Sequence, residues 1–490
     1  MAFVAGVDSS TQSCKVVVVD SGTGRTVRSG KASHPDGSEI HPSLWWDALR
    51  SAVHDAGGLA DVSVLSIAGQ QHGMVLLDSD GEVIRPALLW NDTRSAPSAA
   101  DLVAEVGATA LASRCGSVPV ASLTITKVRW VRDNEPEHAA RVAAVALPHD
   151  WLSWRLRGYG PAGESPLGPD LDQLTTDRSD ASGTGYWSPS TGSYDLELFE
   201  LAFGRPAREA SSPASGAVTL PRVAAPDESV GTVHPTLFDL MPDGVRLAAG
   251  AGDNAAGALG LGAAEGDVVV SVGTSGTVFA VAEGPSNDPT GTVAGFADAS
   301  GAFLPIAVTL NAARILSSVA GLLGVTFDEF ADLALAAEPG SAGVVLVPYF
   351  EGERTPNLPD ATASFHGLSI ASTTRENTAR AAIEGMLCGL AGGLEAITAT
   401  GVTASRLLLI GGAVQNTAVQ VVAGQVFDVP VIIPTPGEYV ARGAAVQAAW
   451  MLDGSRPEWP LATITSPAAD HRPEILANYK KAANSVFKAQ

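Results

Sequence analysis

The fold is predicted from one stretch near the start of the chain, Phe3-Val4-Ala5-Gly6-Val7-Asp8-Ser9-Ser10-Thr11-Gln12-Ser13-Cys14-Lys15-Val16-Val17-Val18-Val19-Asp20. Its apolar runs at residues 3–7 and 15–20 predict two short strands, and the polar loop between them is rich in hydroxyl groups. A similar order returns at residues 270–282, where Gly273-Thr274-Ser275-Gly276 joins two apolar runs. The repeat predicts two α/β domains of related architecture.

The length of the chain, 490 residues, also favours two domains, because a single core rarely grows to this size. We expect an N-terminal domain at residues 1–244, a C-terminal domain at 245–450, and a tail with a helix at 451–490. A strand at 246–251 would open the second domain. Residues 207–226 are rich in Ser, Pro and Ala and are expected to form a linker or an irregular surface stretch.

The composition argues against several classes of partner. The formal net charge of −22 disfavours nucleic acid, since binding to its phosphates requires clustered Lys and Arg. The three cysteines, Cys14, Cys115 and Cys388, show no CxxC spacing, so neither a disulfide framework nor a zinc site is expected. The sequence shows no basic leader and no apolar run of the length that spans a membrane. We therefore expect a cytoplasmic protein without a membrane partner.

Two loops could hold phosphate groups. The loop at 8–15 offers hydroxyl and backbone N–H donors, and Asp8 at its rim could hold Mg²⁺. The loop at 273–276 offers glycines, which allow the backbone to approach a phosphate closely. Either loop alone could be an ordinary polar hairpin, but a nucleotide held between two domains would need both. No P-loop or dinucleotide-binding motif is present in the sequence.

Asp253 comes directly after a predicted strand, in Gly250-Ala251-Gly252-Asp253-Asn254. Small neighbours leave its carboxylate accessible to a ligand, as required of a base that accepts a proton from an attacking hydroxyl group. The alternative is that Asp253 is the N-cap of the following helix. The two roles are compatible, and the pattern alone does not choose between them.

Two further loops combine groups that bind sugars. Gln71 and His72 follow a strand predicted at 62–68 and could donate hydrogen bonds to sugar hydroxyls. The run Trp90-Asn91-Asp92-Thr93-Arg94 adds an aromatic ring, an amide, a carboxylate and a guanidinium, which suit the apolar faces and hydroxyls of a sugar. A surface histidine and a turn with a buried tryptophan are the alternatives. No GxSxG or HExxH motif supports a hydrolase or a metalloenzyme.

Taken in their order, these loops resemble those of the FGGY carbohydrate kinases. The resemblance implies two actin-like (ribonuclease-H-like) domains with a cleft between them, with the sugar mainly on the N-terminal side and ATP mainly on the C-terminal side. The run Ser179-Asp180-Ala181-Ser182 and the loop at 69–73 favour D-xylulose as the substrate and D-xylulose 5-phosphate as the product. The matching segments are residues 6–15, 69–73, 89–94, 176–184, 250–254, 272–276 and 410–416.

The same resemblance implies roles for residues of this sequence, with ATP as co-substrate and Mg²⁺ as cofactor. Asp253 would be the general base, and Asp8 would act in catalysis by holding Mg²⁺ near the phosphates. Gln71 stands where many relatives carry Met, which bears on the choice of sugar. A homodimer is one expected assembly. The sugar contacts would be Gln71, His72, Trp90, Asn91, Asp92, Asp253 and Asn254. The ATP contacts would be Thr11, Gln12, Ser13, Lys15, Gly273, Thr274, Ser275, Gly276, Asn311, Gly411, Gly412, Gln415 and Asn416.

Three alternatives remain open at this point. A kinase of L-ribulose, L-fuculose or glycerol would carry similar loops. A sugar- or nucleotide-binding protein that has lost catalysis is disfavoured by the full set of loops with Asp253 intact. An actin-like ATPase would leave the loops at 71–72 and 90–94 without a purpose.

Overall fold

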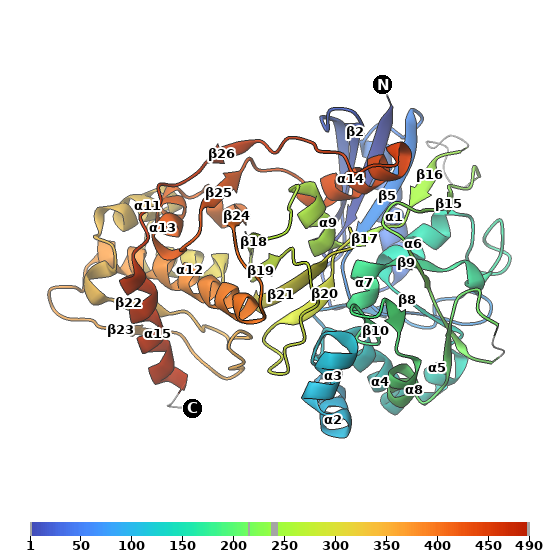
Figure 1. Ribbon diagram of the computed structural model, residues 1–490, viewed down its shortest axis with the longest axis horizontal. Coiled ribbons are helices and arrows are strands. Elements are labelled where there is room, and N and C mark those ends of the chain that lie inside the picture. Colours follow the sequence, from blue (N-terminus) through green and yellow to red (C-terminus); the bar gives the residue numbers. More distant parts are fainter. Residues whose placement is uncertain (1, 214–215, 237–243, 488–490) are drawn as a thin grey trace.

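The computed structural model describes residues 2–213, 216–236 and 244–487, and it contains two large mixed sheets (Figure 1). The first sheet has the strand order β15 (Ser229–Thr232), β16 (Arg246–Ala248), β5 (Val62–Gly69), β1 (Phe3–Ser9), β2 (Ser13–Asp20), β3 (Thr26–Ser33), and β17 (Ala251–Gly252) also pairs with β5. The second sheet has the order β26 (Thr463–Thr465), β25 (Val431–Pro434), β24 (Arg406–Ile410), β18 (Asp267–Val272), β19 (Gly276–Ala280), β21 (Phe303–Thr309), β20 (Ala294–Ala297).

The two sheets repeat one pattern of strand directions. In the first sheet β1 is antiparallel to β2 and parallel to β5, and β2 is antiparallel to β3. In the second sheet β18 is antiparallel to β19 and parallel to β24, and β19 is antiparallel to β21. Each domain therefore begins with the same strand, loop and strand unit, which confirms the predicted repeat and the α/β fold.

Strands β1 and β2 are apolar throughout because both faces of the first sheet are covered. Ala5 and Val16 belong to a core formed with helix α1 (Pro42–Asp55). Val4 and Val17 belong to the core on the other face, which includes helix α14 (Tyr439–Asp453). A strand buried on both faces needs an uninterrupted apolar run rather than an alternating one.

Two helices lie between the sheets, α9 (Asp253–Gly260) and α14, and they touch backbone to backbone (Figure 1). A Cβ atom added to Gly443 of α14 would lie 1.7 Å from the carbonyl oxygen of Ala256 in α9. A Cβ atom added to Gly260 of α9 would lie 1.9 Å from the carbonyl oxygen of Tyr439. No side chain fits at either position, so the pair of glycines sets how closely the two domains approach.

The first sheet extends beyond residue 244, the predicted domain boundary. β16 and β17 both follow that residue, and both pair in parallel with β5 of the first sheet. The strand predicted at 246–251 is therefore present as β16 and β17, but it closes the first sheet instead of opening the second. We propose that the division lies after α9, between residues 260 and 267, where the chain passes to β18.

The segment 207–226 is not a linker between domains. It contains β12 (Ala207–Glu209), β13 (Val218–Leu220) and β14 (Arg222–Ala224), of which β13 pairs with β8 (Ala144–Ala146) and β14 with β9 (Thr175–Asp177). Residues 214–215 lie outside the described part. This Ser-, Pro- and Ala-rich segment therefore contributes short strands to the small sheets of the first domain.

The remaining helices cover the outer faces of the two sheets and the small sheets of the first domain. In the first domain they are α2 (Ala96–Val106), α3 (Ala108–Cys115), α4 (Thr124–Asn134), α5 (Pro136–Arg141), α6 (Pro148–Leu156), α7 (Arg178–Ser182) and α8 (Leu196–Phe203). In the second domain they are α10 (Ala313–Leu323), α11 (Phe327–Ala336), α12 (Arg375–Ala399), α13 (Thr417–Val426) and α15 (Pro473–Phe487). The remaining strands are β4 (Glu39–Ile40), β6 (Val75–Leu77), β7 (Ala87–Leu88), β10 (Trp187–Ser188), β11 (Ser193–Tyr194), β22 (Val345–Val347) and β23 (Ser364–His366).

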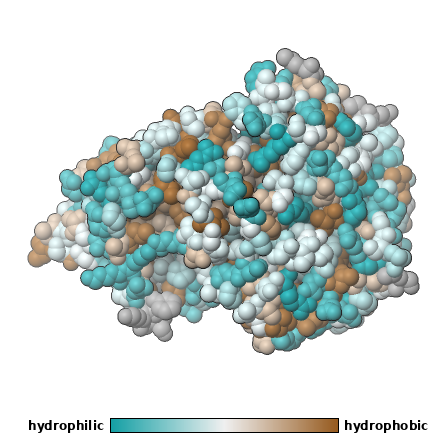
Figure 2. Space-filling model, in the orientation of Figure 1, coloured by the Kyte–Doolittle hydropathy of each residue, from teal (hydrophilic) through white to brown (hydrophobic). Residues whose placement is uncertain are grey.

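Helix α12 is long and apolar enough to cross a membrane by length and composition, but its packing is that of a core helix. Two thirds of its most apolar window is buried (67%). It contacts α10, α11, α13, α15 and the strands β19, β21 and β22. On the face of the molecule seen in Figure 2, hydrophobic residues are scattered among hydrophilic ones.

Substituting Gly443 tests the contact between the domains. We expect Gly443→Ala to lower the free energy of unfolding by about 3 kcal/mol, the upper range for overpacking, because the added methyl group meets rigid backbone. Urea unfolding followed by circular dichroism measures the loss. Gly321→Ala is the matched control, since Gly321 also lies within a helix but has open space around it. It should be neutral or stabilising by up to about 1 kcal/mol. Equal stabilities of the two variants would contradict the role of the glycine pair.

Candidate active site

A cleft of about 990 Å³ lies between loops of both domains. The first domain contributes the loop after β1, the loop after β5 and the loop around Trp90, and the second domain contributes the turn between β18 and β19. The predicted site residues that line the cleft are Asp8, Thr11, Gln12, Ser13, Lys15, Gln71, His72, Trp90, Asn91, Asp253, Asn254, Gly273, Thr274 and Ser275.

Strand register brings the two catalytic candidates, Asp8 and Asp253, to one edge of the first sheet. Asp8 pairs with Ala68 of β5, and Ala251 of β17 pairs with the same residue from the other side. Parallel strands end at the same edge of a sheet, and ligands in open α/β sheets bind there. The ends of β1, β5 and β17 therefore place Asp8, Gln71 and Asp253 next to one another although they are far apart in sequence.

Asp8 is a buried carboxylate with one nearby cation. The residue is 4% exposed, and its Oδ1 accepts a hydrogen bond from the hydroxyl of Ser10. Lys15 Nζ lies 3.8 Å from Oδ2 of Asp8 and 2.6 Å from Oε2 of Glu438. Burial raises the pKa of Asp8 and outweighs the opposing effects of Ser10 and Lys15. A second cation beside Asp8 would therefore stabilise the charged form of this buried carboxylate.

Asp253 is the first residue of α9, and Gly252 is the N-cap residue, so the N-cap alternative is wrong. Its Oδ1 accepts hydrogen bonds from the backbone N–H of Asn254 at 2.8 Å and from the Asn254 amide at 3.0 Å. Burial, and then the charge of Asp8, raise the pKa of Asp253 to about 7. This carboxylate is suited to accept a proton near neutral pH.

His72 can accept a hydrogen bond from a ligand, whereas the sequence suggested donation. Its backbone is left-handed (φ 68°), and its Nδ1 lies 2.7 Å from the carbonyl oxygen of Gly183. A carbonyl oxygen only accepts, so Nδ1 carries the proton. Burial, and then the charge of Lys127, lower the pKa of His72 to about 3, which keeps the ring neutral. Nε2 is therefore an acceptor.

Gln71 and Trp90 are held by hydrogen bonds to neighbouring residues. The amide of Gln71 donates to the carbonyl oxygen of Ser179 at 3.1 Å and accepts from the amide of Asn254 at 3.4 Å. The indole N–H of Trp90 donates to the hydroxyl of Thr11 at 2.8 Å, which joins the predicted sugar loop to the predicted phosphate loop.

Asp92 was predicted to contact sugar, but the structure does not place it among the residues that line the cleft. Its carboxylate accepts hydrogen bonds from Arg94 at 2.8 Å and 2.9 Å and from Ser38 at 2.8 Å. It is buried, and these bonds overcome the effect of burial and lower its pKa. Its role is to fix the turn that carries Trp90 and Asn91.

Two residues predicted to contact ATP, Asn311 and Gly276, pack closely against other residues of the second domain. The amide of Asn311 donates to the carbonyl oxygen of Gly352 at 2.7 Å and to Glu353 at 3.1 Å, and the residue is buried. Gly276 opens β19, where an added Cβ would lie 2.5 Å from Leu390 and Thr309 side-chain atoms. Neither is among the residues that line the described cleft, and their contact with ATP stays a prediction.

The predicted adenosine residues lie next to the glycine loop. Gly411 follows β24, and a Cβ there would lie 2.4 Å from the carbonyl oxygen of Val272, one residue before the loop. Asn416 is the N-cap of α13, where its side chain accepts from two backbone N–H groups. Gly412 and Gln415 are exposed. These four residues do not line the described cleft, and their contact with adenosine stays a prediction.

The sequence missed Arg314, Arg354 and Phe296, which also line the cleft. The ring of Phe296 lies 5.5 Å from that of His72. Arg314 lies in the first turn of α10, Phe296 in β20 and Arg354 in a loop of the second domain, and no motif in the sequence marks them. Only the folding of the chain brings them to the site.

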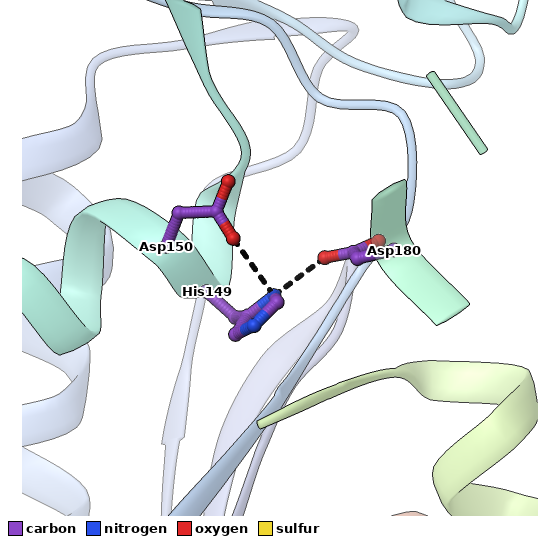
Figure 3. Close-up of side chains that lie close together, drawn as sticks. All are labelled: His149, Asp150 and Asp180. Atoms are coloured by element: carbon purple, nitrogen blue, oxygen red, sulfur yellow. Dashed lines mark hydrogen bonds and ion pairs between the residues drawn. The ribbon is translucent and has the colours of Figure 1, made fainter. Parts of the chain in front are cut away.

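Behind the cleft lies a buried cluster of His149, Asp150 and Asp180 (Figure 3). His149 Nδ1 lies 2.5 Å from Asp180 and 3.4 Å from Asp150, and Asp177 lies 4.0 Å from Nε2. Burial disfavours a charged histidine, but the three carboxylates raise the pKa of His149 to about 10. The ligand atoms are close enough to suggest a metal site, lying within 4.8 Å of one another. Nδ1, however, already makes a short hydrogen bond, so the cluster is a buried ion pair.

The His149 cluster supports the active-site loops through Ser179. Asp177 accepts from the Ser179 backbone N–H at 2.7 Å and from its hydroxyl at 2.6 Å. The Ser179 hydroxyl oxygen accepts from the backbone N–H of Gly252, and the Ser179 carbonyl holds Gln71. The run around Ser179, noted in the sequence, therefore positions Gln71 directly and Asp253 through the preceding residue, Gly252.

Comparisons with known proteins identify the class. Residues 3–260 match the N-terminal domain of the FGGY family of carbohydrate kinases, and residues 268–452 match its C-terminal domain. The chain belongs to the FGGY family of carbohydrate kinases. This confirms the predicted family, and with it the two-domain actin-like fold.

Two similar proteins and one similar crystal structure are xylulose kinases. The chain is 47% identical to the xylulose kinase of Streptomyces coelicolor over 459 residues, which cover 92% of this chain and 88% of that protein. It is 45% identical to the xylulose kinase of Streptomyces rubiginosus, over 93% of this chain and 89% of that protein. The crystal structure of xylulose kinase from Bifidobacterium adolescentis superimposes with a TM-score of 0.90 at 46% identity, and covers 98% of this chain and 99% of that chain.

Replacement of His149 tests the buried cluster. We expect His149→Gln to lower the free energy of unfolding by about 3–5 kcal/mol, because it leaves buried carboxylates without a cation. His149→Lys keeps the charge and should recover part of the loss. Because the pKa of His149 is raised, its stabilising effect is complete below its ordinary pKa of about 6.5 and is lost as the pH rises toward about 10.

The control is His138→Gln, which removes a surface ion pair with Glu135 at 2.8 Å. This substitution should lower the free energy of unfolding by less than about 1 kcal/mol. Thermal and urea unfolding at several pH values measure all three variants. A His149→Gln variant as stable as the control would show that the cluster does not depend on the cation.

Proposed function

We propose that the protein transfers the γ-phosphoryl group of ATP to D-xylulose, giving ADP and D-xylulose 5-phosphate. The names of its similar proteins and its membership of the FGGY family support the substrate and the donor. The observation that carries the mechanism is the Asp253 carboxylate, whose pKa of about 7 and position beside Asp8 suit a base in a cleft between two domains.

In this proposal the residues of the cleft have separate roles in proton transfer, sugar binding and phosphate binding. Asp253 accepts the proton of the sugar hydroxyl as its oxygen attacks the γ-phosphorus. His72 Nε2 accepts from another sugar hydroxyl and so helps to orient the sugar. The hydroxyl-rich loop after β1 and the turn at 273–275 donate hydrogen bonds to phosphate oxygens, as loops rich in backbone N–H groups do. These loops bind anions without adding net positive charge.

The residues present fit a Mg²⁺ ion. Asp8 and Asp253 supply carboxylate oxygens, the ligand type that Mg²⁺ prefers, and the charge of Asp8 raises the pKa of Asp253. Asp8 would hold the ion, with Asp253 nearby. When bound together with ATP, Mg²⁺ would neutralise charge on the phosphates.

The open cleft also implies closure. Closure of the two domains over the substrates would exclude water and limit ATP hydrolysis. We also propose a cytoplasmic location. A homodimer stays a prediction.

A panel of sugars tests the substrate. We expect D-xylulose to give the highest kcat/KM for ADP release, above L-ribulose, L-fuculose and glycerol. A different preferred sugar would overturn the substrate but keep the kinase. Release of ADP at the same rate without any sugar would overturn the kinase mechanism and favour an ATPase.

Asp253→Asn tests the base. We expect a loss of about 10²–10⁴-fold in kcat, the usual range for a general base, with the fold unchanged. Asp101→Asn, on the exposed surface of α2, is the control and should keep full activity. A fully active Asp253→Asn variant would exclude this residue as the base.

The pH profile gives an independent reading of Asp253. A base must be deprotonated, and burial beside Asp8 raises the pKa of Asp253 to about 7 in the free enzyme. We therefore expect kcat/KM to fall tenfold per pH unit below this value and to level off above it. A profile that is flat from about pH 5 to pH 8 would contradict a base with a raised pKa.

A further inference from the structure

Arg354 places a guanidinium in the cleft that has no partner among the described residues. Three side chains among the cleft residues belong to Lys or Arg: Lys15, Arg314 and Arg354. Lys15 pairs with Glu438 at 2.6 Å and Arg314 with Glu351 at 2.7 Å. In the described part of the chain the guanidinium of Arg354 has no hydrogen bond or ion pair. A half-buried, unpaired cation is costly for the fold, so its presence calls for a ligand.

The backbone on both sides of Arg354 is fastened to the second sheet. The carboxylate of Glu353, 3% exposed, accepts from the backbone N–H groups of Arg354 at 2.8 Å and of Leu310 at 2.7 Å, and from the amide of Asn311. The hydroxyl of Thr355 donates to the carbonyl oxygen of Val308 at 2.8 Å. The backbone that carries Arg354 is therefore held in place before a ligand binds.

The segment 310–313, which Glu353 holds at Leu310 and Asn311, also contacts the glycine loop. The backbone N–H of Ala313, two residues after Asn311, donates to the carbonyl oxygen of Gly273 at 2.9 Å. Across the cleft, the charge of Arg354 contributes to lowering the pKa of His72, so the guanidinium also lies within electrostatic reach of the sugar side. Arg354 thus lines the same cleft as Gly273 of the phosphate loop and His72, the proposed sugar contact.

We propose that Arg354 binds the oxygens of the phosphoryl group during its transfer and then holds the phosphate of the sugar-phosphate product. Negative charge develops on three equatorial oxygens of the phosphoryl group during transfer, and the planar guanidinium matches such oxygens in a bidentate way. Neutral sugar hydroxyls do not require an unpaired cation. The carboxylates of Asp8 and Asp253 repel the incoming phosphate, and a fixed cation offsets this repulsion. The inference rests on the proposed function for the identity of the sugar.

Binding measurements on Arg354→Gln and Arg354→Lys test the inference. Isothermal titration with D-xylulose, with D-xylulose 5-phosphate and with inorganic phosphate in the presence of MgADP separates sugar from phosphate recognition. We expect Arg354→Gln to weaken both phosphate ligands about 10-fold or more, the range for hydrogen bonds to charged groups. The affinity for D-xylulose should change by less than about twofold. Lys keeps the charge but not the fork, so it should recover part of the phosphate affinity.

Kinetics and stability complete the test. We expect kcat of Arg354→Gln to fall by about 10²–10³-fold, as when one donor to a transition-state oxygen is lost. Because Arg354 is unpaired, the variant should unfold at the same temperature as the wild type or higher. Arg375→Gln, an exposed arginine at the start of α12, is the control and should match the wild type throughout.

Each outcome decides one question. Equal weakening of D-xylulose and D-xylulose 5-phosphate would make Arg354 a sugar ligand and overturn the proposal, as would unchanged phosphate binding. If the wild type fails to phosphorylate D-xylulose, the proposed substrate is wrong, while titration with inorganic phosphate still decides the role of Arg354.

Discussion

The contact between helices α9 and α14 is the constraint on which the rest of the structure depends. Gly443 faces the carbonyl of Ala256, and Gly260 faces the carbonyl of Tyr439, with no room for a side chain at either glycine. On the other side of α14, a Cβ added to Gly6 of β1 would lie 1.9 Å from the carbonyl of Ala441. Close backbone approach of this kind leaves few arrangements of the two sheets. It also sets where the two domains meet beside the cleft, while the loops across the cleft stay free to close over the substrates.

The electrostatics of the cleft follow from this arrangement. α9 begins at Asp253 where β17 ends, and β17 lies beside β5, which in turn lies beside β1 and Asp8. Two carboxylates thus share one site, and the charge of Asp8 contributes to the raised pKa of Asp253. A protein with a net charge of −22 can still bind polyanions here, because backbone N–H groups, hydroxyls and one unpaired guanidinium face the cleft. The same groups give phosphate recognition without a basic surface.

Features of the fold that depend on local interactions could be predicted from the sequence, whereas features that depend on contacts between distant residues could not. The first hairpin, its repeat at β18 and β19, and the loop residues Asp8 and Gly273 were predictable, because apolar runs and turn residues act locally. The extent of the first sheet was not, since β16 pairs with β5, some 180 residues earlier in the chain. Asp92 and Asn311 were assigned to ligands because polar loop residues look alike in sequence. Their buried partners, Arg94 and Glu353, appear only after folding.

The sequence by itself determined the class of fold, the family and most of the loops that form the cleft, because these depend on patterns within about ten residues. The tertiary structure alone decided the chemical state of the site. It made His72 a hydrogen-bond acceptor, through the carbonyl of Gly183, and brought His149 among three buried carboxylates. It also placed Arg354 in the cleft, where none of the described carboxylates pairs with it. The physical reason is that pKa values, hydrogen-bond roles and unpaired charges depend on burial and on neighbours distant in sequence, which no local pattern encodes.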